Sequence, residues 1–152
     1  MSVESGGRRI LIQGMALVLV GLLWGFVVPL TPYPRLALVA HTEFELNGML
    51  IIALGLLLLK LPHAVGPKSI AVMLLSVVLT WIMVLSEAAN AWWGTNQMLP
   101  IAASQAGATG GEAWQELVIK LTHISAGLGL VAAWALLMLG FVRTPVAAHS
   151  GS

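Results

Sequence analysis

The sequence AHTEFELNGMLIIALGLLLL, residues 40–59, places a histidine, two glutamates and an asparagine at the head of a segment that is otherwise typical of a membrane-spanning helix. Polar side chains at membrane depth are costly, so they are usually paired, buried between helices or functional. In a helix, one stripe of this segment carries His41, Glu45, Gly48, Ile52 and Gly55.

This stripe combines a possible ligand, His41, with two positions that lack a side chain, Gly48 and Gly55. A flat macrocyclic cofactor needs that combination, so the spacing predicts a cofactor site with His41 as the ligand and the glycines beneath the ring. Two alternatives stay open. Glycines at this spacing also let helices approach closely, and an intramembrane histidine could simply hydrogen-bond a neighbour.

The composition excludes several classes of protein. Charged residues make up 9% of the 152 residues, far below the roughly 25% of a soluble domain, and mean hydropathy is +0.94, so we expect an integral membrane protein of one domain. The chain has no cysteine, which excludes disulfides, iron–sulfur clusters and zinc–thiolate sites. A formal charge of +1 gives no reason to expect a nucleic acid as a partner.

Four apolar stretches are long enough to cross a bilayer, and loops rich in proline or glycine separate them. We therefore predict an all-α fold, a four-transmembrane-helix up-down-up-down bundle. The expected organisation is a polar N-terminal tail over residues 1–9, a transmembrane domain over 10–142 with helices at about 10–30, 36–61, 70–93 and 112–142, and a C-terminal tail over 143–152.

The basic residues predict how the bundle is oriented. Five of them flank one side of the membrane: Arg8, Arg9, Lys60, Lys68 and Arg143. Only Arg35, with Lys120 as a less clear case, marks the other side. The positive-inside rule then places both termini in the cytoplasm.

Polar residues from three helices should meet at the opposite end of the bundle. The second helix begins with His41, Glu43, Glu45 and Asn47, the third ends with Glu87 and Asn90, and the fourth begins with Glu112, Glu116, Lys120 and His123. In an antiparallel bundle these three ends share one face. A purely structural bundle has no need for such a layer, so we expect a functional site there. The alternative is a hydrated cap in which the polar groups satisfy one another.

Several short motifs in and around this layer follow one another in the order found in a known protein family. They are Ala40-His41 with Leu46-Asn47-Gly48, then Ala89-Asn90-Ala91-Trp92-Trp93-Gly94-Thr95, Leu99-Pro100-Ile101-Ala102 and Trp114-Gln115-Glu116. The first resembles the second helix of the bacterial styrene oxide isomerases and hydroxylaminobenzene mutases, and the later ones are closer to the mutases. The resemblance spans about residues 10–142. It implies a small four-helix isomerase of the inner (cytoplasmic) membrane that needs no external oxidant or reductant.

The resemblance also implies a cofactor and an assembly. The epoxide isomerases of this family hold haem b between the protomers of a trimer; their axial histidine matches His41, and two asparagines of the site match Asn47 and Asn90. The chain would then be a homo-oligomer, with ferric haem b as a Lewis acid and the asparagines holding the leaving oxygen. A small apolar aromatic substrate would enter from the lipid bilayer.

The reaction implied is the conversion of an arylhydroxylamine to a 2-aminophenol, or of an aryl epoxide to an aldehyde. The isomerases also use a tyrosine just after the asparagine of the third helix. This chain has one tyrosine, Tyr33, in another loop, and the matching place is near Gly94. That departure favours the mutase branch.

The charged residues of the layer leave several roles open. Glu45, Glu87 and Glu116 could each stabilise positive charge or orient His41 through its second nitrogen, although a structural ion pair is the simpler interpretation for each. Glu116 and Lys120 are four residues apart, which predicts an ion pair along the fourth helix.

Two further hypotheses belong to other functional classes. His123 could be a second axial ligand beside His41, which would make the chain a bis-histidine electron-transfer subunit. The chain could also be a cofactor-free membrane scaffold or carrier, with the polar layer serving as an interhelical network or a substrate path.

Overall fold

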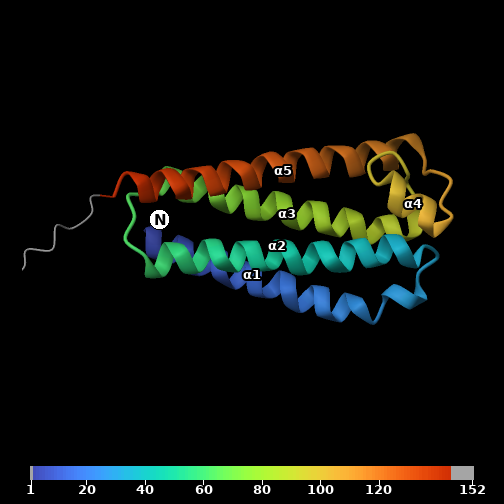
Figure 1. Cartoon of the computed structure of the whole chain (residues 1–152), viewed down its shortest axis with the longest axis horizontal. Helices are drawn as coiled ribbons and strands as arrows, with labels where there is room; N and C mark the ends of the chain where they lie inside the picture. Colours follow the sequence, from blue (N-terminus) through green and yellow to red (C-terminus); the bar gives the residue numbers. More distant parts are fainter. Residues whose placement is uncertain (1, 145–152) are drawn as a thin grey trace, which may run out of the picture.

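The structure, a computed structural model of the chain, describes residues 2–144 and is all-helical over that range (Figure 1). Its elements are α1 (Val3–Gly25), the 3-10 turn η1 (Val28–Leu30), α2 (Pro34–Lys60), α3 (Pro67–Trp93), the short α4 (Pro100–Ala106) and α5 (Ala113–Val142). The helices α1, α2, α3 and α5 run up-down-up-down, and each is long and apolar enough to cross a membrane. The predicted fold is confirmed.

Prolines, a glycine and a cap set the ends of these helices. Pro34, Pro67 and Pro100 each lie in the first turn of a helix. Backbone N–H groups have no partner within the helix there, so the missing N–H of proline costs no hydrogen bond. Gly94 ends α3 with φ 65°, in the left-handed region that favours glycine. Glu112 caps α5, since its side chain and that of Gln115 form a capping box.

The structure differs from the predicted boundaries in three places. α1 begins at Val3, inside the predicted N-terminal tail, because the Ser2 side chain accepts a hydrogen bond from the N–H of Ser5 at 3.2 Å and caps the first turn. The same helix ends at Gly25, ahead of a proline in η1. The connection 94–111, predicted as a loop, contains α4. From residue 145 on, the predicted C-terminal tail lies outside the described residues.

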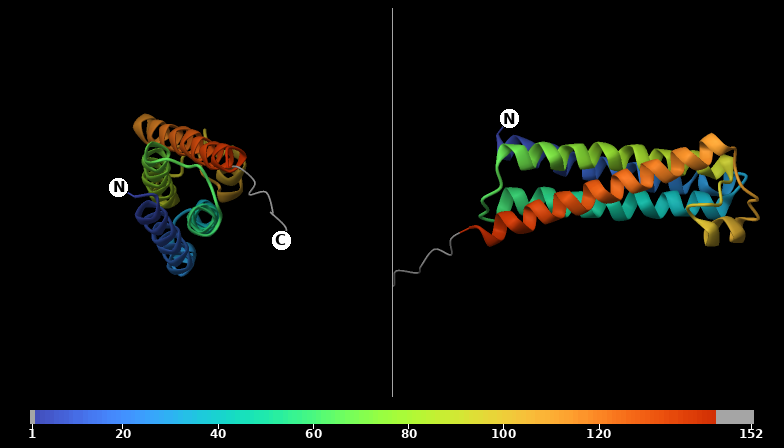
Figure 2. Two further views of the ribbon diagram at one scale, coloured as in Figure 1. Left: turned by 90° about the vertical axis from the view of Figure 1, so that its left-hand side faces the viewer. Right: turned by 90° about the horizontal axis from the view of Figure 1, so that it is seen from above.

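The bundle is built from two pairs of helices. α1 packs on α2 and α3 packs on α5, while contacts between α2 and α3 join the pairs. α5 makes little contact with α2, and Figure 2 shows it lying across the bundle at an angle to α3. The core near the termini is apolar, with Ile10, Ile70 and Leu137 almost fully buried.

Glycines let α1 and α2 approach closely. A Cβ atom on Gly14 would lie 2.6 Å from a backbone nitrogen of α2, and one on Gly55 would lie 2.7 Å from a backbone nitrogen of α1. A Cβ atom on Gly48 would lie 2.6 Å from a valine methyl of α1. No side chain tolerates distances this short, so the close packing of α1 on α2 requires glycine at these positions. We call these three residues the glycine seam.

We expect Gly14→Ala to destabilise the bundle, because the added methyl would push α2 away from α1. Overpacking of this kind costs about 1–3 kcal/mol, which corresponds to a fall in melting temperature of about 3–9 °C for a chain of this size. Gly127→Ala is the matched control, since a Cβ atom there would meet nothing within 4 Å. Thermal unfolding in detergent compares the two variants, and equal melting temperatures would contradict the seam.

Candidate functional site

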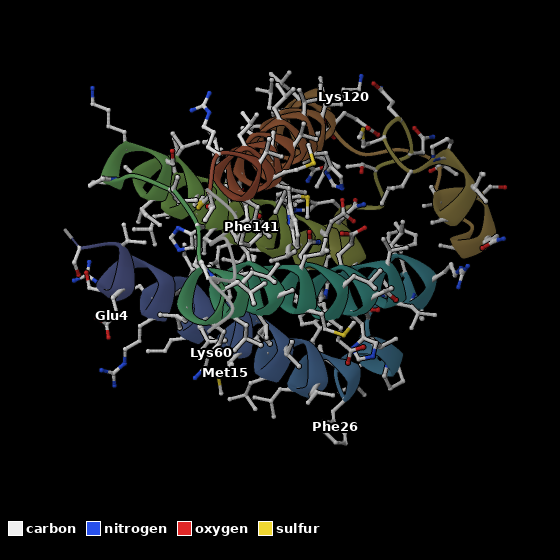
Figure 3. All side chains as sticks on the ribbon, turned by 60° about the vertical axis from the view of Figure 1, so that its left-hand side comes forward. Glu4, Met15, Phe26, Lys60, Lys120 and Phe141 are labelled. Carbon is white, nitrogen blue, oxygen red and sulfur yellow. The ribbon has the colours of Figure 1, made fainter. Side chains whose placement is uncertain are left out.

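Most of the buried polar side chains lie at the α4 end of the bundle, opposite the N-terminus (Figure 1). Oxygen and nitrogen atoms of side chains gather there, between the end of α3 and the start of α5 (Figure 3). The predicted convergence of polar residues from three helices is therefore present. Three of them, Asn47, Glu87 and Asn90, together with the partly exposed Glu43 and His123, form what we call the buried polar cluster.

Glu87 and His123 meet between α3 and α5. The Glu87 side chain is 0% exposed, and its Oε1 lies 3.2 Å from Nε2 of His123. The other ring nitrogen, Nδ1, lies 2.8 Å from the carbonyl oxygen of Ile119 on the same helix. Neither carboxylate oxygen of Glu87 completes a hydrogen bond with any residue from 2 to 144. Buried polar atoms are nearly always bonded, so these two oxygens mark a place where a further partner belongs.

Asn90 lies one turn beyond Glu87 on α3 and is 0% exposed. Its Oδ1 accepts hydrogen bonds from the N–H of Thr95 at 2.9 Å and from the hydroxyl of Thr95 at 2.7 Å. These bonds fix the orientation of the amide. Its Nδ2 has no hydrogen-bond partner among the described residues. Nδ2 of Asn90 thus lies close to Glu87 and interacts with its side chain, although no hydrogen bond of regular geometry joins them.

Glu43 is a site residue that the sequence reasoning left out of its candidates. Its Oε2 accepts a hydrogen bond from Nδ2 of Asn47 at 2.6 Å, and Asn47 is only 5% exposed. Glu43 also interacts electrostatically with Glu87 across the interface of α2 and α3. The signal was available, since Glu43 and Asn47 are four residues apart on one face of a helix.

Glu116 anchors the connection between α3 and α5. Its Oε1 accepts from the backbone N–H groups of Asn96 at 2.9 Å and Gly111 at 3.2 Å, and its Oε2 accepts from that of Gln97 at 3.1 Å. Lys120 instead donates to the side chain of Gln97. The hydrogen bonds of Glu116 therefore go to the loop that carries α4, while Lys120 still interacts with its carboxylate electrostatically.

His41 lies on the α1 side of α2. Its Nδ1 lies 2.8 Å from the carbonyl oxygen of Gly21, so this nitrogen carries the proton and donates it. A backbone carbonyl, rather than a glutamate, thus orients the ring. Nε2 is left with a lone pair, 3.6 Å from Oε1 of Glu45, which is longer than a hydrogen bond. The His41 side chain as a whole is 25% exposed, so α1 and α2 cover it only in part.

The structure gives Gly48 and Gly55 a packing role in the glycine seam. α1 covers the face above them, so no macrocycle fits over these two residues. This corrects the prediction that they bind a cofactor ring. Asn47 also points away from His41, because two side chains six residues apart lie about 120° apart around the axis of a helix. The predicted site residues therefore fall into two groups, one on each side of α2.

One imidazole nitrogen in the described part of the chain could serve as the axial ligand of a metal that a macrocycle holds. Across residues 2–144 no three His, Asp or Glu side chains gather to hold a metal ion. A bare ion needs several protein ligands, whereas a macrocycle brings most of its own and needs one axial nitrogen. Nε2 of His41 fits that need. His123 does not, since Glu87 and Ile119 already face its two nitrogens.

Tyr33 reaches the end of α3 from the loop that follows η1. A Cβ atom on Gly94 would lie 2.6 Å from Cε2 of its ring and 3.1 Å from its hydroxyl. The backbone N–H of Tyr33 also donates to the carbonyl of Ala91 at 3.1 Å. The sequence places this tyrosine far from Asn90, and the fold brings it next to the glycine that follows α3.

Comparisons with known proteins agree with the motifs. Residues 7–142 match the family described as styrene oxide isomerase. The chain is 37% identical to the hydroxylaminobenzene mutase HabB of Ectopseudomonas oleovorans over 91% of this chain and 82% of that protein. It is 29% identical to the hydroxylaminobenzene mutase HabA of the same organism, over 86% of this chain and 95% of that one. No solved structure matches.

We expect Glu116→Gln to loosen the connection between α3 and α5, because an amide offers one acceptor where the carboxylate offers two. Hydrogen bonds to a charged group are worth about 1.5–3 kcal/mol, so amide exchange at Asn96, Gln97 and Gly111 should accelerate about 10–100-fold. Hydrogen–deuterium exchange measures this, with the exposed Glu4→Gln as the control. Unchanged protection at the three amides would show that Glu116 is not the anchor.

Proposed function

The chain belongs to the styrene oxide isomerase family and is an isomerase or mutase, and on that premise we propose that it rearranges an arylhydroxylamine to a 2-aminophenol inside the membrane. The choice of reaction rests on the similarity to HabB. That similarity extends over 91% of the chain, and HabB is named a hydroxylaminobenzene mutase. The reaction is an isomerisation, so it needs no oxidant or reductant.

We propose ferric haem b as the cofactor and His41 as its axial ligand. The hydrogen bond from Nδ1 to Gly21 supports this, because a metal-binding histidine almost always donates its other ring N–H to such a partner. When bound, ferric haem supplies a Lewis acid that polarises the N–O bond of the substrate. Since His41 is only partly covered by its own chain, we propose that another copy completes the site, as a homo-oligomer and, by resemblance, a trimer.

Asn47 and Asn90 supply neutral hydrogen-bonding groups, and the apolar helices around them supply a dry environment. We propose that Nδ2 of Asn90, which has no hydrogen-bond partner among the described residues, holds the oxygen that leaves nitrogen. Because Asn90 and His41 lie on opposite sides of α2 in one chain, the haem of one copy would face the α3 side of another copy in the proposed oligomer. Asn47 has its N–H committed to Glu43, so it acts as a positioning residue. Cleavage of the N–O bond puts positive charge beside the aromatic ring, and water would trap it. A site within apolar helices keeps water away.

A small apolar aromatic substrate concentrates in lipid and can reach a membrane-embedded site from the bilayer.

The ends of α1 and α5 that carry Arg8, Arg9 and Arg143 lie together, away from Arg35 (Figure 1). We propose that this end faces the cytoplasm across the inner membrane of a bacterium.

Isomerisation of an aryl epoxide to an aldehyde is the second candidate. The contact between Tyr33 and Gly94 favours it, because the fold brings a phenolic hydroxyl to the end of α3 that carries Asn90. In that reaction the same neutral environment would serve the opening of the C–O bond.

We expect His41→Ala to lose both haem and activity, because no other described histidine combines an uncommitted ring nitrogen with a partly exposed side chain. The test is the absorption spectrum of the detergent-purified protein, expressed with added haem precursor, followed by an assay for 2-aminophenol. The matched variant is His123→Ala, which should keep its Soret band.

Three other outcomes are informative. Haem and activity retained in His41→Ala would overturn the assignment of the ligand. A low-spin spectrum lost in both variants would favour the bis-histidine electron-transfer subunit. A folded, colourless wild-type protein would favour the cofactor-free scaffold or carrier.

A further inference from the structure

We propose that Glu87 and His123 hold a single proton between them and exchange it with the substrate during the rearrangement. This inference rests on the proposed function and adds the residues that move protons. No role in the mechanism above uses either side chain. Both lie in the buried polar cluster, one on α3 and one on α5.

The hydrogen-bond geometry determines the number of protons. A carbonyl oxygen only accepts hydrogen bonds, so Nδ1 of His123, 2.8 Å from the carbonyl of Ile119, must carry a proton. Nε2 then faces Oε1 of Glu87 at 3.2 Å. If both atoms were bare, two lone pairs would face each other in a site that excludes water. One proton therefore lies between them, as a carboxylic acid beside an imidazole or a carboxylate beside an imidazolium.

The surroundings favour keeping that proton between the two side chains. Glu87 is fully buried, and a lone charge there would be costly. The titratable group that faces it from α2 is Glu43, which would add a second negative charge. The other polar neighbour is Asn90, with its unpartnered N–H. A substrate oxygen bound to that N–H would bring the reacting atoms within one helical turn of the pair.

The rearrangement moves one proton from carbon and one proton to nitrogen, and such a pair can serve both transfers. The N–O bond of the arylhydroxylamine breaks and a C–O bond forms at the ortho carbon. That carbon then loses its hydrogen as a proton, and the electron pair of the C–H bond restores the aromatic ring. The nitrogen stays bonded to the ring and keeps its one hydrogen, and it gains a proton to become the amine. One proton is lost from carbon and one is gained by nitrogen, so the net change is zero.

Glu87 and His123 can perform both transfers. The pair accepts the ring proton on one basic atom and gives its own proton to nitrogen, and it ends with one proton as it began. Epoxide isomerisation by a hydride shift moves no proton in this way, so the pair serves the hydroxylamine reaction specifically.

The test compares wild type with Glu87→Gln, which keeps the shape of the side chain but cannot exchange a proton, and with Glu87→Asp, which can. The substrate is phenylhydroxylamine, with and without deuterium at both ortho carbons, and the Soret band checks that the haem content is unchanged. General acid–base groups contribute about 10²–10⁴-fold, so kcat should fall at least ~100-fold in Glu87→Gln. Glu87→Asp should retain more activity, and Glu4→Gln should match wild type.

The deuterium isotope effect separates proton transfer from structural damage. If the pair takes the ring proton, removal of that proton becomes rate-limiting in Glu87→Gln and the isotope effect rises. A fall in kcat with an unchanged isotope effect would overturn the inference, and so would a Glu87→Gln variant within about 3-fold of wild type. If wild type itself makes no 2-aminophenol, the proposed function fails and this inference falls with it.

Discussion

The close approach of α1 and α2 is the constraint on which both sides of α2 depend. Because the glycine seam removes side chains from the contact, the carbonyl of Gly21 comes within 2.8 Å of His41 and fixes its ring. That one bond determines the tautomer and leaves the lone pair of the ring on Nε2. The same packing turns Glu43 and Asn47 toward α3, where they join the buried polar cluster.

The cluster is unusual for the interior of an apolar bundle. Its members come from α2, α3 and α5, and three of its atoms, both carboxylate oxygens of Glu87 and Nδ2 of Asn90, have no hydrogen-bond partner among residues 2–144. A bundle selected for stability alone would fill this space with apolar side chains, because half-satisfied polar networks are worse than an apolar core. Glu116, in contrast, is fully committed to holding the loop beside the cluster.

The sequence predicted what depends on hydropathy and helical periodicity. Four helices, their antiparallel order and the convergence of polar residues at one end all follow from where apolar runs and prolines lie. It left open what depends on partners far along the chain. Gly48 and Gly55 could line a ring or a helix, and only the position of α1 decides between them. The bonds of Glu116 to the loop, and the contact of Tyr33 with Gly94, likewise require the folded chain.

Membership of the styrene oxide isomerase family makes the chain an isomerase or mutase, and the reaction proposed for it moves an oxygen within one molecule. The most direct test uses phenylhydroxylamine labelled with oxygen-18, incubated with purified wild-type protein in unlabelled water without oxidant or reductant. Intramolecular transfer predicts that the 2-aminophenol formed retains the label. Loss of the label to unlabelled oxygen would mean that water attacks the ring, and it would contradict a dry site that carries out an isomerisation.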